Sequence, residues 1–306
     1  MKWVESINID FMAHTRIAGL VSAIAVAISV GLLVVKGLAF GLDFTGGSLV
    51  ELQFPTEPNL QEVRSTLTNA GFENVVVQAF GAATDVVVRL AQDDAPKAGD
   101  AVFETLTGAG YQPELMRSEY VGSQVGEELR EQGGLGLLLA LGLVMLYVAF
   151  RFQLKFSVGA VVALLHDVLI VLGVFSLLQL DFDLTVLAAV LAVIGYSLND
   201  TIVVSDRIRE NFRIMRTTDP REVMNASINQ TLSRTIATSV TTLLVLIALL
   251  LFGGELIRQF ALALTIGVAV GTYSSIYVAA NVLLMLGISR DDLIVVEIET
   301  EEDQRP

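Results

Sequence analysis

Six apolar stretches dominate this sequence, and each is long enough to cross about 30 Å of hydrocarbon as a helix. A bilayer offers the backbone no water, so a spanning stretch must satisfy its own peptide groups, as a helix does. The hydrophobic share of 53% exceeds that of an ordinary soluble protein. We therefore predict an α-helical polytopic membrane protein with spans near residues 17–38, 133–150, 156–178, 184–204, 236–252 and 260–286.

The first apolar stretch could be a cleaved signal peptide or a permanent anchor. It is longer than a typical signal-peptide core, and no small-x-small cleavage site follows it. We interpret it as an uncleaved span.

Basic residues are distributed unequally between the two sets of connections. Between Asp43 and Arg130 there are 14 acidic and five basic residues, whereas between Asp206 and Arg234 there are six arginines and four acids. Lys and Arg are retained on the cytoplasmic side, so we predict cytoplasmic N and C termini and a periplasmic acidic region. The chain then divides into a cytoplasmic or interfacial segment (1–16), the first span (17–38), a periplasmic domain (39–132), a bundle of five spans (133–286) with a cytoplasmic loop (205–235), and an acidic cytoplasmic tail (287–306).

The predicted periplasmic region has the patterns of a small folded domain. Val50, Leu52 and Phe54 alternate as in a strand, and residues 59–70 have helical spacing after an Asn cap. Two β-branched runs, a second helix and a last strand follow by residue 120. The order βαββαβ predicts an inserted α+β domain of ferredoxin-like type.

Two segments outside the spans have the apolar spacing of membrane-surface helices. Ile208, Phe212 and Met215 repeat at i, i+4 and i+7 among arginines, which favours a helix lying on anionic lipid. Before the first span, an interfacial segment is indicated by Trp3, Val4, Ile7, Phe11 and Met12. We interpret both segments as anchors to membrane lipids.

Two carboxylates lie inside predicted spans, where ionisable groups are costly and therefore candidates for function. Asp167 lies midway along the third span beside His166, and Asp200 lies in the fourth. Ser197 and Thr201 share a helical face with Asp200.

Polar residues in the last two spans complete a predicted polar core. Arg234 opens the fifth span and precedes a stripe of hydroxyls, and in the sixth span Gly267 and Gly271 form a small-residue seam that continues into Thr272, Ser274 and Ser275. If Arg234 can approach and leave Asp200, the two states differ in proton affinity, which coupling of proton flow to motion requires. We predict Asp200 and Arg234 as a proton-coupling pair, supported by Ser197, Asn199, Thr201, Thr238, Ser239, His166 and Asp167.

Each of these features also has a purely structural interpretation. Asp200 could form a static polar contact, and Arg234 could be a snorkelling anchor. For His166 and Asp167 we favour a satisfied pair that orients helices, and for the Gly267–Gly271 seam we favour packing.

Composition excludes several kinds of site. The chain has no cysteine and two histidines, which excludes disulfides, thiolate metal sites and a metal centre built from imidazoles. We therefore expect no metal and no cofactor. We also expect no nucleic-acid partner, since no loop combines basic residues with stacking aromatics. Ser197 and His166 superficially resemble an intramembrane protease dyad, but Leu198 and Asn199 follow the serine and no G-x-S-x-G elbow is present. We therefore predict that the chain is not an enzyme.

Several motifs resemble the SecD/SecF family of protein-export subunits. Asp43-Phe44-Thr45-Gly46-Gly47 is similar to the family's D-F-x-G-G signature, although the Gly pair alone could be a turn. Residues 121–129 resemble the stretch that leads into the second span, and residues 195–211 resemble the SecF branch more than the SecD branch. Residues 233–235, 238–239 and 271–277 agree with the following helices, so the resemblance extends over roughly residues 5–290.

The resemblance implies one half of a twelve-helix transporter related to resistance–nodulation–division exporters, with SecD as the other half. Such a complex lies in the bacterial inner membrane and uses the proton motive force to promote translocation of a preprotein through the SecYEG channel. The family's proton-coupling carboxylate and arginine fall on Asp200 and Arg234. Two other possibilities remain open at this point, namely a self-contained proton-driven exporter and a non-transporting scaffold of the translocon.

Overall fold

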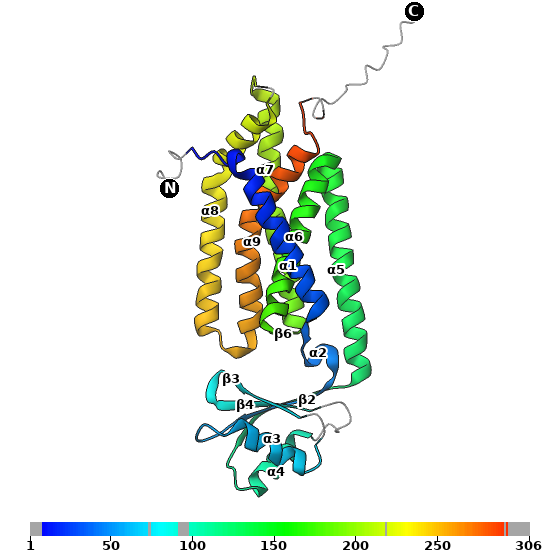
Figure 1. The fold of residues 1–306 in the computed structure, drawn as a ribbon, viewed down its shortest axis with the longest axis vertical. Coiled ribbons are helices and arrows are strands. Elements are labelled where there is room, and N and C mark those ends of the chain that lie inside the picture. The colour runs from blue at the N-terminus through cyan, green and yellow to red at the C-terminus, as the bar shows by residue number, and fades with distance from the viewer. Residues whose placement is uncertain (1–7, 73–74, 91–97, 218, 291, 293–306) are drawn as a thin grey trace, which may run out of the picture.

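The computed structural model describes residues 8–72, 75–90, 98–217, 219–290 and 292. Six of its helices are long and apolar enough to cross a membrane, and a small α/β domain lies at one end of the bundle that they form (Figure 1). These helices are α1 (Thr15–Val35), α5 (Ser123–Arg151), α6 (Leu154–Leu178), α7 (Leu184–Ile214), α8 (Pro220–Phe252) and α9 (Glu255–Met285). The predicted fold class is confirmed.

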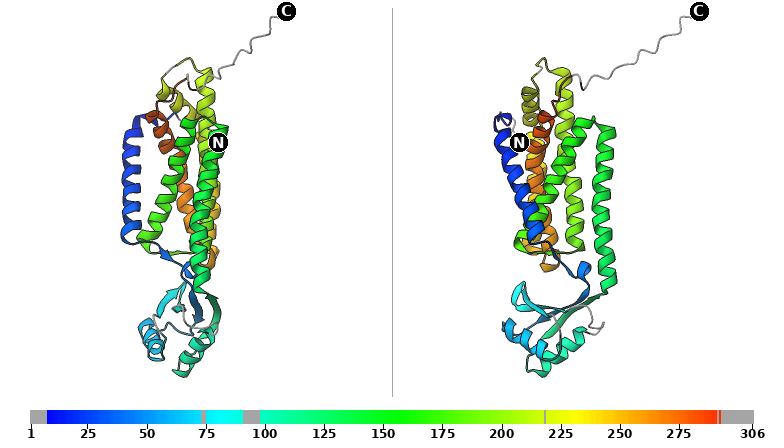
Figure 2. Two further views of the ribbon diagram at one scale, coloured as in Figure 1. Left: turned by 90° about the vertical axis from the view of Figure 1, so that its right-hand side faces the viewer. Right: turned by 45° about the vertical axis from the view of Figure 1, so that its right-hand side comes forward.

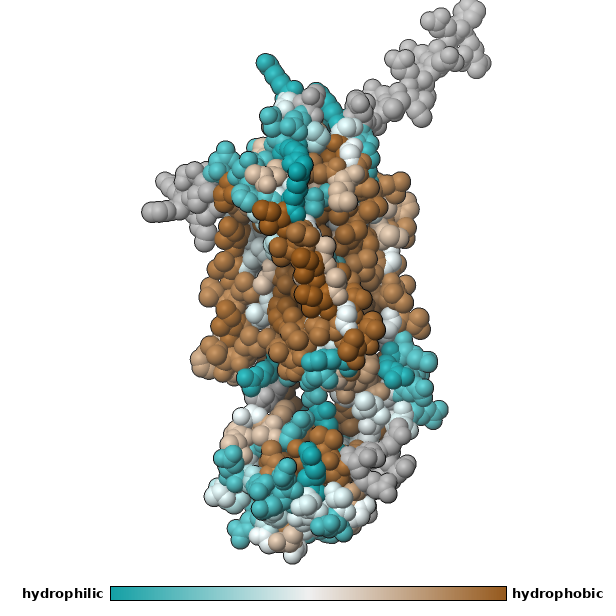
Figure 3. Space-filling view, in the orientation of Figure 1, coloured by the Kyte–Doolittle hydropathy of each residue, from teal (hydrophilic) through white to brown (hydrophobic). Residues whose placement is uncertain are grey.

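The bundle has an inner and an outer set of helices. Each of these helices contains an apolar window of 18 residues. Within the protein, 50% of this window is buried for α6 and α7 and 44% for α9, but only 6% for α5. The two further views place α1 and α5 at the outside of the bundle (Figure 2). A continuous hydrophobic belt covers the helices in the space-filling view, and hydrophilic residues gather at both ends (Figure 3). Polar side chains on the inward faces of α6, α7 and α9 therefore lie where water and lipid are largely excluded.

The α/β domain has the predicted βαββαβ order. Its elements are β2 (Gly47–Gln53), α3 (Leu60–Asn69), β3 (Val76–Phe80), β4 (Ala82–Leu90), α4 (Ala98–Gly108) and β5 (Glu114–Val121). The strands form an antiparallel sheet in the order β3-β4-β2-β5, which is the ferredoxin-like arrangement. Val50 and Val88 of the sheet pack with Val63, Leu67 and Val102 of the two helices to form the core.

The segment predicted as a large cytoplasmic loop is mostly helical. Helix α7 continues to Ile214, and α8 begins at Pro220 after an N-cap at Asp219, whose side chain accepts a hydrogen bond from the amide of Arg221. Only residues 215–219 connect the two helices. The apolar windows fixed the predicted ends of the spans, but helices need not end where hydrophobicity does.

The predicted membrane-surface helix is wrong. Ile208 and Phe212 are buried in a cluster that also contains Phe11, Met12 and Met224. A helical apolar face packs on a neighbouring helix as well as on lipid, and its spacing does not distinguish the two. Phe11 and Met12 likewise pack inside the protein, while Trp3, Val4 and Ile7 lie outside the described residues.

Candidate functional site

Asp167 lies at the point where three inner helices meet. Its side chain is fully buried on α6, and its Oδ2 accepts hydrogen bonds from Ser197 Oγ on α7 (2.5 Å) and Ser274 Oγ on α9 (2.7 Å). Its Oδ1 lies 2.9 Å from His166 Nδ1. The His166 ring stacks on Tyr273, and its Nε2 is buried without a partner among the described residues. Asp167 therefore joins three helices and has both carboxylate oxygens occupied.

Asp200 lies less than one turn beyond Ser197 on α7, in a different environment. The residue is 3% exposed, and its Oδ2 is buried with no hydrogen-bond partner in the described part of the chain. The hydroxyls of Thr201 on α7 and Thr235 on α8 are also buried, with no hydrogen-bond partner among the residues that the structure describes. Polar atoms at the inner helix contacts thus remain available for a proton or another partner.

Nearby, α8 and α9 are joined by a hydroxyl contact. Ser239 Oγ and Thr272 Oγ1 lie 2.7 Å apart. The adjacent seam of α9 packs against α7, because a Cβ on Gly267 would lie 2.1 Å from Val193 Cγ2, and one on Gly271 would lie 3.1 Å from Ser197 Cβ. The interpretation of this seam as a packing surface is confirmed.

Arg234 lies on α8 with an exposed side chain, and the ion pairs of the described residues include none between Arg234 and Asp200. The structure therefore has these two residues within electrostatic reach of each other but without a direct ion pair.

Two of the predicted supporting residues are not part of the buried core. Asn199 is exposed, since it lies on the opposite side of α7 from Ser197 and Asp200. Thr238 is half-buried, and its hydroxyl donates to the backbone carbonyls of Arg234 and Thr235 in its own helix. Neighbouring positions on a helix point about 100° apart, so Asn199 could not share the face of Asp200.

The residues of the glycine motif lie elsewhere, at the junction of the bundle and the α/β domain. Asp43 and Phe44 belong to the short helix α2 (Leu42–Thr45), and Gly46 and Gly47 lead into β2. Phe44 is buried against the ends of α6 and α7. The sequence identified this motif but not its contacts.

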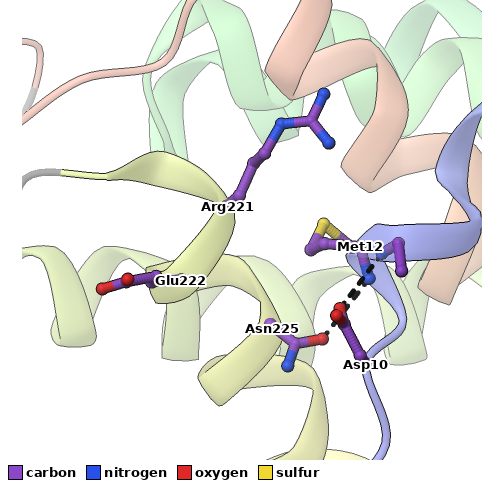
Figure 4. Close-up of a pocket in the computed structure, with 6 residues that line it drawn as sticks. Asp10, Met12, Arg221, Glu222 and Asn225 are labelled. Atoms are coloured by element: carbon purple, nitrogen blue, oxygen red, sulfur yellow. Dashed lines mark hydrogen bonds between the residues drawn. The ribbon is translucent and has the colours of Figure 1, made fainter.

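A cavity of about 280 Å³ lies between the N-terminal segment and the start of α8 (Figure 4). It is lined by Asp10, Met12, Ala13, Arg221, Glu222 and Asn225. Asn225 Oδ1 accepts hydrogen bonds from the amides of Phe11 (2.8 Å) and Met12 (3.4 Å) and so holds the N-terminal segment on α8. The mixed charges of the lining do not select an anion or a cation, and the cavity contains none of the predicted site residues.

Comparisons with known proteins identify the family. A model described as "Protein export membrane protein SecD/SecF, C-terminal" matches residues 102–289, and one described as "SecD/SecF GG Motif" matches residues 31–54. Protein translocase subunit SecF of Pseudomonas aeruginosa is 54% identical over 301 residues, which cover 98% of both chains. The chain belongs to the SecF group of the SecD/SecF family. Protein translocase subunit SecF of Escherichia coli O157:H7 is 41% identical over 302 residues, 97% of this chain and 94% of its own.

Solved structures agree with this membership. The crystal structure of SecDF, a translocon-associated membrane protein from Thermus, is 40% identical and superposes with a TM-score of 0.85 over 93% of this chain. The match covers 39% of that longer SecDF chain. A second structure, of SecDF in a super-membrane-facing form, has the same identity and a TM-score of 0.69 over 92% of this chain. SecF members are translocase subunits, which are transport proteins and not enzymes.

Proposed function

We propose that this chain acts with SecD in the bacterial inner membrane and uses the proton motive force to promote preprotein translocation through the SecYEG channel. In this proposal Asp200 carries the proton and Arg234 is its switchable partner. The observation that supports the assignment most is the contrast between two buried carboxylates: both oxygens of Asp167 are occupied, whereas Asp200 keeps a buried oxygen without a partner.

The chemistry of Asp200 follows from its burial. A buried carboxylate anion without a partner is costly, and the cost is relieved either by a proton or by an approaching guanidinium. The protonated form of Asp200 and the form paired with Arg234 therefore favour different positions of α7 relative to α8, which carries Arg234. Moving one charge through 100 mV supplies about 2.3 kcal/mol, so one or two protons can drive a conformational step of several kcal/mol.

The proposed topology has the α/β domain in the periplasm and both termini in the cytoplasm. The arginines between residues 206 and 221 lie at the opposite end of the bundle from that domain, as retention of basic residues in the cytoplasm requires (Figure 1). Residue 69 ends α3 in this domain, and the cysteine-free chain allows Asn69→Cys as the sole labelling site. Labelling by an impermeant maleimide in cells with an intact inner membrane is expected; labelling only after that membrane is breached would reverse the topology.

SecD as partner is supported by polar residues on the outer surface of the bundle. Asn199 on α7 and Arg234 on α8 are exposed in the isolated chain. Polar side chains in membrane spans usually face other helices or water, because lipid offers them no partner. This chain also matches only 39% of the Thermus SecDF chain, whose remaining length could supply the covering helices.

The mechanism also requires that the chain adopt more than one arrangement. The two SecDF structures are equally identical to this chain and cover almost the same share of it, but their TM-scores are 0.85 and 0.69. This difference supports family members having at least two arrangements of the same region.

The test is late-stage preprotein translocation into inverted vesicles that contain this chain, SecD and SecYEG, with and without a proton gradient. Asp200→Asn removes the titratable proton and keeps the size, so the complex should assemble but lose the stimulation by the gradient. Arg234→Lys loses the planar fork of the guanidinium and should reduce that stimulation at least partly.

Asp167→Asn is the control, with a milder expected effect. If Asp200→Asn responds to the gradient as the unmodified chain does, Asp200 is not the coupling residue. Full translocation activity of that variant would instead favour a scaffold.

A further inference from the structure

The turn between α6 and α7, residues 179–183, is hydrogen-bonded to a segment outside the bundle. It contains the short strand β6 (Asp181–Phe182), which pairs in parallel with β1 (Ala39–Phe40) just after α1. The amide of Gly41 donates to the carbonyl of Phe182 at 2.8 Å and extends this pairing. The chain that leaves α1 for the α/β domain is therefore hydrogen-bonded to the entrance of α7, the helix that carries Asp200.

Asp43 of the glycine motif caps α7 from another part of the chain. Its Oδ2 accepts a hydrogen bond from the amide of Leu184, the first residue of α7, at 3.0 Å. The helix's own N-cap, Asp183, accepts from the amide of Val186 at 2.8 Å. The first amides of a helix have no partner within the helix, and carboxylates there also interact favourably with its dipole. Asp43 thus binds the amide of Leu184, whereas Asp183 binds the amide of Val186.

An ion pair adds a second link, directly from the sheet. Arg89 of β4 is paired with Asp181 in the turn. Both side chains are partly buried, at 25% and 35% exposure, so the pair is less screened by solvent than most surface pairs.

Aromatic packing forms the apolar part of the junction. Phe44 stacks on Phe182 with ring centroids 5.9 Å apart, and Phe40 contacts both rings edge-on. On the other side, Phe175 of α6 contacts Phe182. The turn is therefore packed between the motif and the outer end of α6.

The glycines fix the motif closely against the rest of the domain. Gly46 and Gly47 have φ of 68° and 117°, a region that favours glycine. A Cβ on Gly46 would lie 2.7 Å from Ser123 Cα, and one on Gly47 would lie 2.5 Å from the carbonyl oxygen of Leu90. The motif thus contacts the start of α5 and the end of β4 at distances that no other residue type allows.

We propose that Asp43 and the Arg89–Asp181 pair form a latch that transmits displacement of α7 to the α/β domain. Asp43 is then a positioning residue whose role is to accept a hydrogen bond. Asp200 lies 16 positions after Leu184, about 24 Å along a continuous helix, so movement at Asp200 reaches the latch through α7 itself. This inference rests on the proposed function, since it names the path by which that function moves the domain.

The hydrogen bond of Asp43 is tested by amide hydrogen exchange on the purified complex with SecD. Asp43→Ala should speed exchange of residues 179–186 about fivefold, the usual effect of losing a capping oxygen. Asp43→Asn keeps an acceptor oxygen and should exchange like the unmodified chain. The matched control is Asn59→Ala, which removes the cap of α3, where Asn59 Oδ1 accepts from the amide of Gln61. It should speed exchange in α3 only.

The same variants are then assayed for gradient-driven translocation. Asp43→Ala should lose most of the stimulation by the gradient, and Asp43→Asn should retain it. If both variants lose the stimulation equally while amide exchange in Asp43→Asn stays normal, the charge or proton of Asp43 matters and not its hydrogen bond. The latch would then be refuted for this residue.

The ion pair is tested by charge reversal. Arg89→Asp and Asp181→Arg should each reduce the stimulation, and the double variant should restore it. The control is Arg117→Asp, which breaks the ion pairs of Arg117 with Glu119 on β5 and Glu51 on β2 of the same sheet but leaves the turn untouched. Failure of the double variant to recover, or equal loss in the Arg117 control, would overturn the latch.

Failure of the latch can be distinguished from failure of the proposed function. If Asp200→Asn abolishes the stimulation while Asp43→Ala and both single reversals do not, the proposed function stands and the latch is wrong. If Asp200→Asn retains the stimulation, the proposed function is wrong, and the exchange data alone decide whether the hydrogen bond of Asp43 holds the turn.

Discussion

The two buried carboxylates should respond in opposite directions to replacement by leucine. In Asp167→Leu, the hydroxyls of Ser197 and Ser274 and the ring of His166 lose their shared acceptor in a fully buried position. In Asp200→Leu, an oxygen without a hydrogen-bond partner is replaced by an apolar group. The first change leaves unpaired polar groups, and the second removes one.

The magnitudes follow from the partners. A buried donor left unsatisfied costs about 1–3 kcal/mol, but interhelical hydrogen bonds in membranes average nearer 0.6 kcal/mol, because the polar groups also find partners in the unfolded state within the membrane. Ser274 Oγ already lies 3.2 Å from the carbonyl oxygen of Gly271. We expect Asp167→Leu to lower the free energy of unfolding by about 2–4 kcal/mol. We expect Asp200→Leu to leave it unchanged or raise it by up to about 2 kcal/mol.

The assay is unfolding of the purified chain in mixed micelles with increasing SDS, followed by pulse proteolysis. Asp167→Asn is the matched control, since an amide can accept from both serines and donate to His166, so it should lie close to the unmodified chain. Equal destabilisation by the two leucine variants would refute the reasoning, because it would mean that Asp200 has a stabilising partner in the folded state.

Three further outcomes can be measured with the same chain. Gly267→Ala should lower the free energy of unfolding by about 1–3 kcal/mol, since the added methyl meets Val193 and forces α9 away from α7, and SDS titration checks this. Asn225→Ala should loosen the N-terminal segment on α8, where two hydrogen bonds between Asn229 and Ile9 remain, and limited proteolysis near residue 10 would detect this as faster cleavage; cleavage at the unmodified rate would contradict a role of Asn225 in the docking. The hydrogen bond from Lys155 holds the pKa of Asp292 below its usual range, so this contact stabilises the fold above about pH 4 and is lost as pH falls through the lowered value. Because the pair is partly exposed, Asp292→Asn should cost less than about 1 kcal/mol at pH 7, and the cost should disappear in acid.

The sequence was sufficient for the six helices and for the α/β domain because both have strong periodic signals. Long apolar windows identify spans, and alternating β-branched residues with an Asn cap identify the strands and α3. Helix ends were not predictable from hydrophobicity. Asn211 and Ser227 belong to the parts of α7 and α8 that extend beyond the apolar windows, and a buried hydrogen bond at 2.8 Å joins them there.

The candidate site was predictable in its residues but only partly in its contacts. Burial of Ser197, Asp200 and Thr201 on one face follows from helical spacing, and the structure agrees. Which helix that face meets depends on packing, so the pairing of Ser197 with Asp167 could not be derived from spacing. The preference for Asp167 as a satisfied structural group nevertheless agrees with its three hydrogen-bonded neighbours.

The contacts of the glycine motif were beyond sequence reasoning, because they join residues that are far apart in the chain. Asp43 and Leu184 are separated by 141 positions, and Arg89 and Asp181 by 92. A single sequence has no signal for such a pairing. One indirect sign was present: the motif's aspartate precedes two glycines at a membrane boundary, where close approach of another segment is expected.

Helix α7 is held at three levels, and Asp200 lies between two of them. Asp43 and Asp183 hold its first turn, Ser197 is bound to Asp167 in the middle, and Asn211 is bound to Ser227 and Gln230 at the far end. These contacts are hydrogen bonds. Hydroxyls and amides can exchange hydrogen-bond partners at a cost of about 1 kcal/mol for each bond. The adjoining face of α9 has Gly267 and Gly271 in place of bulky side chains that would interlock. The polar contacts of such a helix can change by exchange of hydrogen bonds. In the proposed mechanism, protonation of Asp200 moves α7 with a few kcal/mol, and the first turn of α7 is where that movement meets the α/β domain.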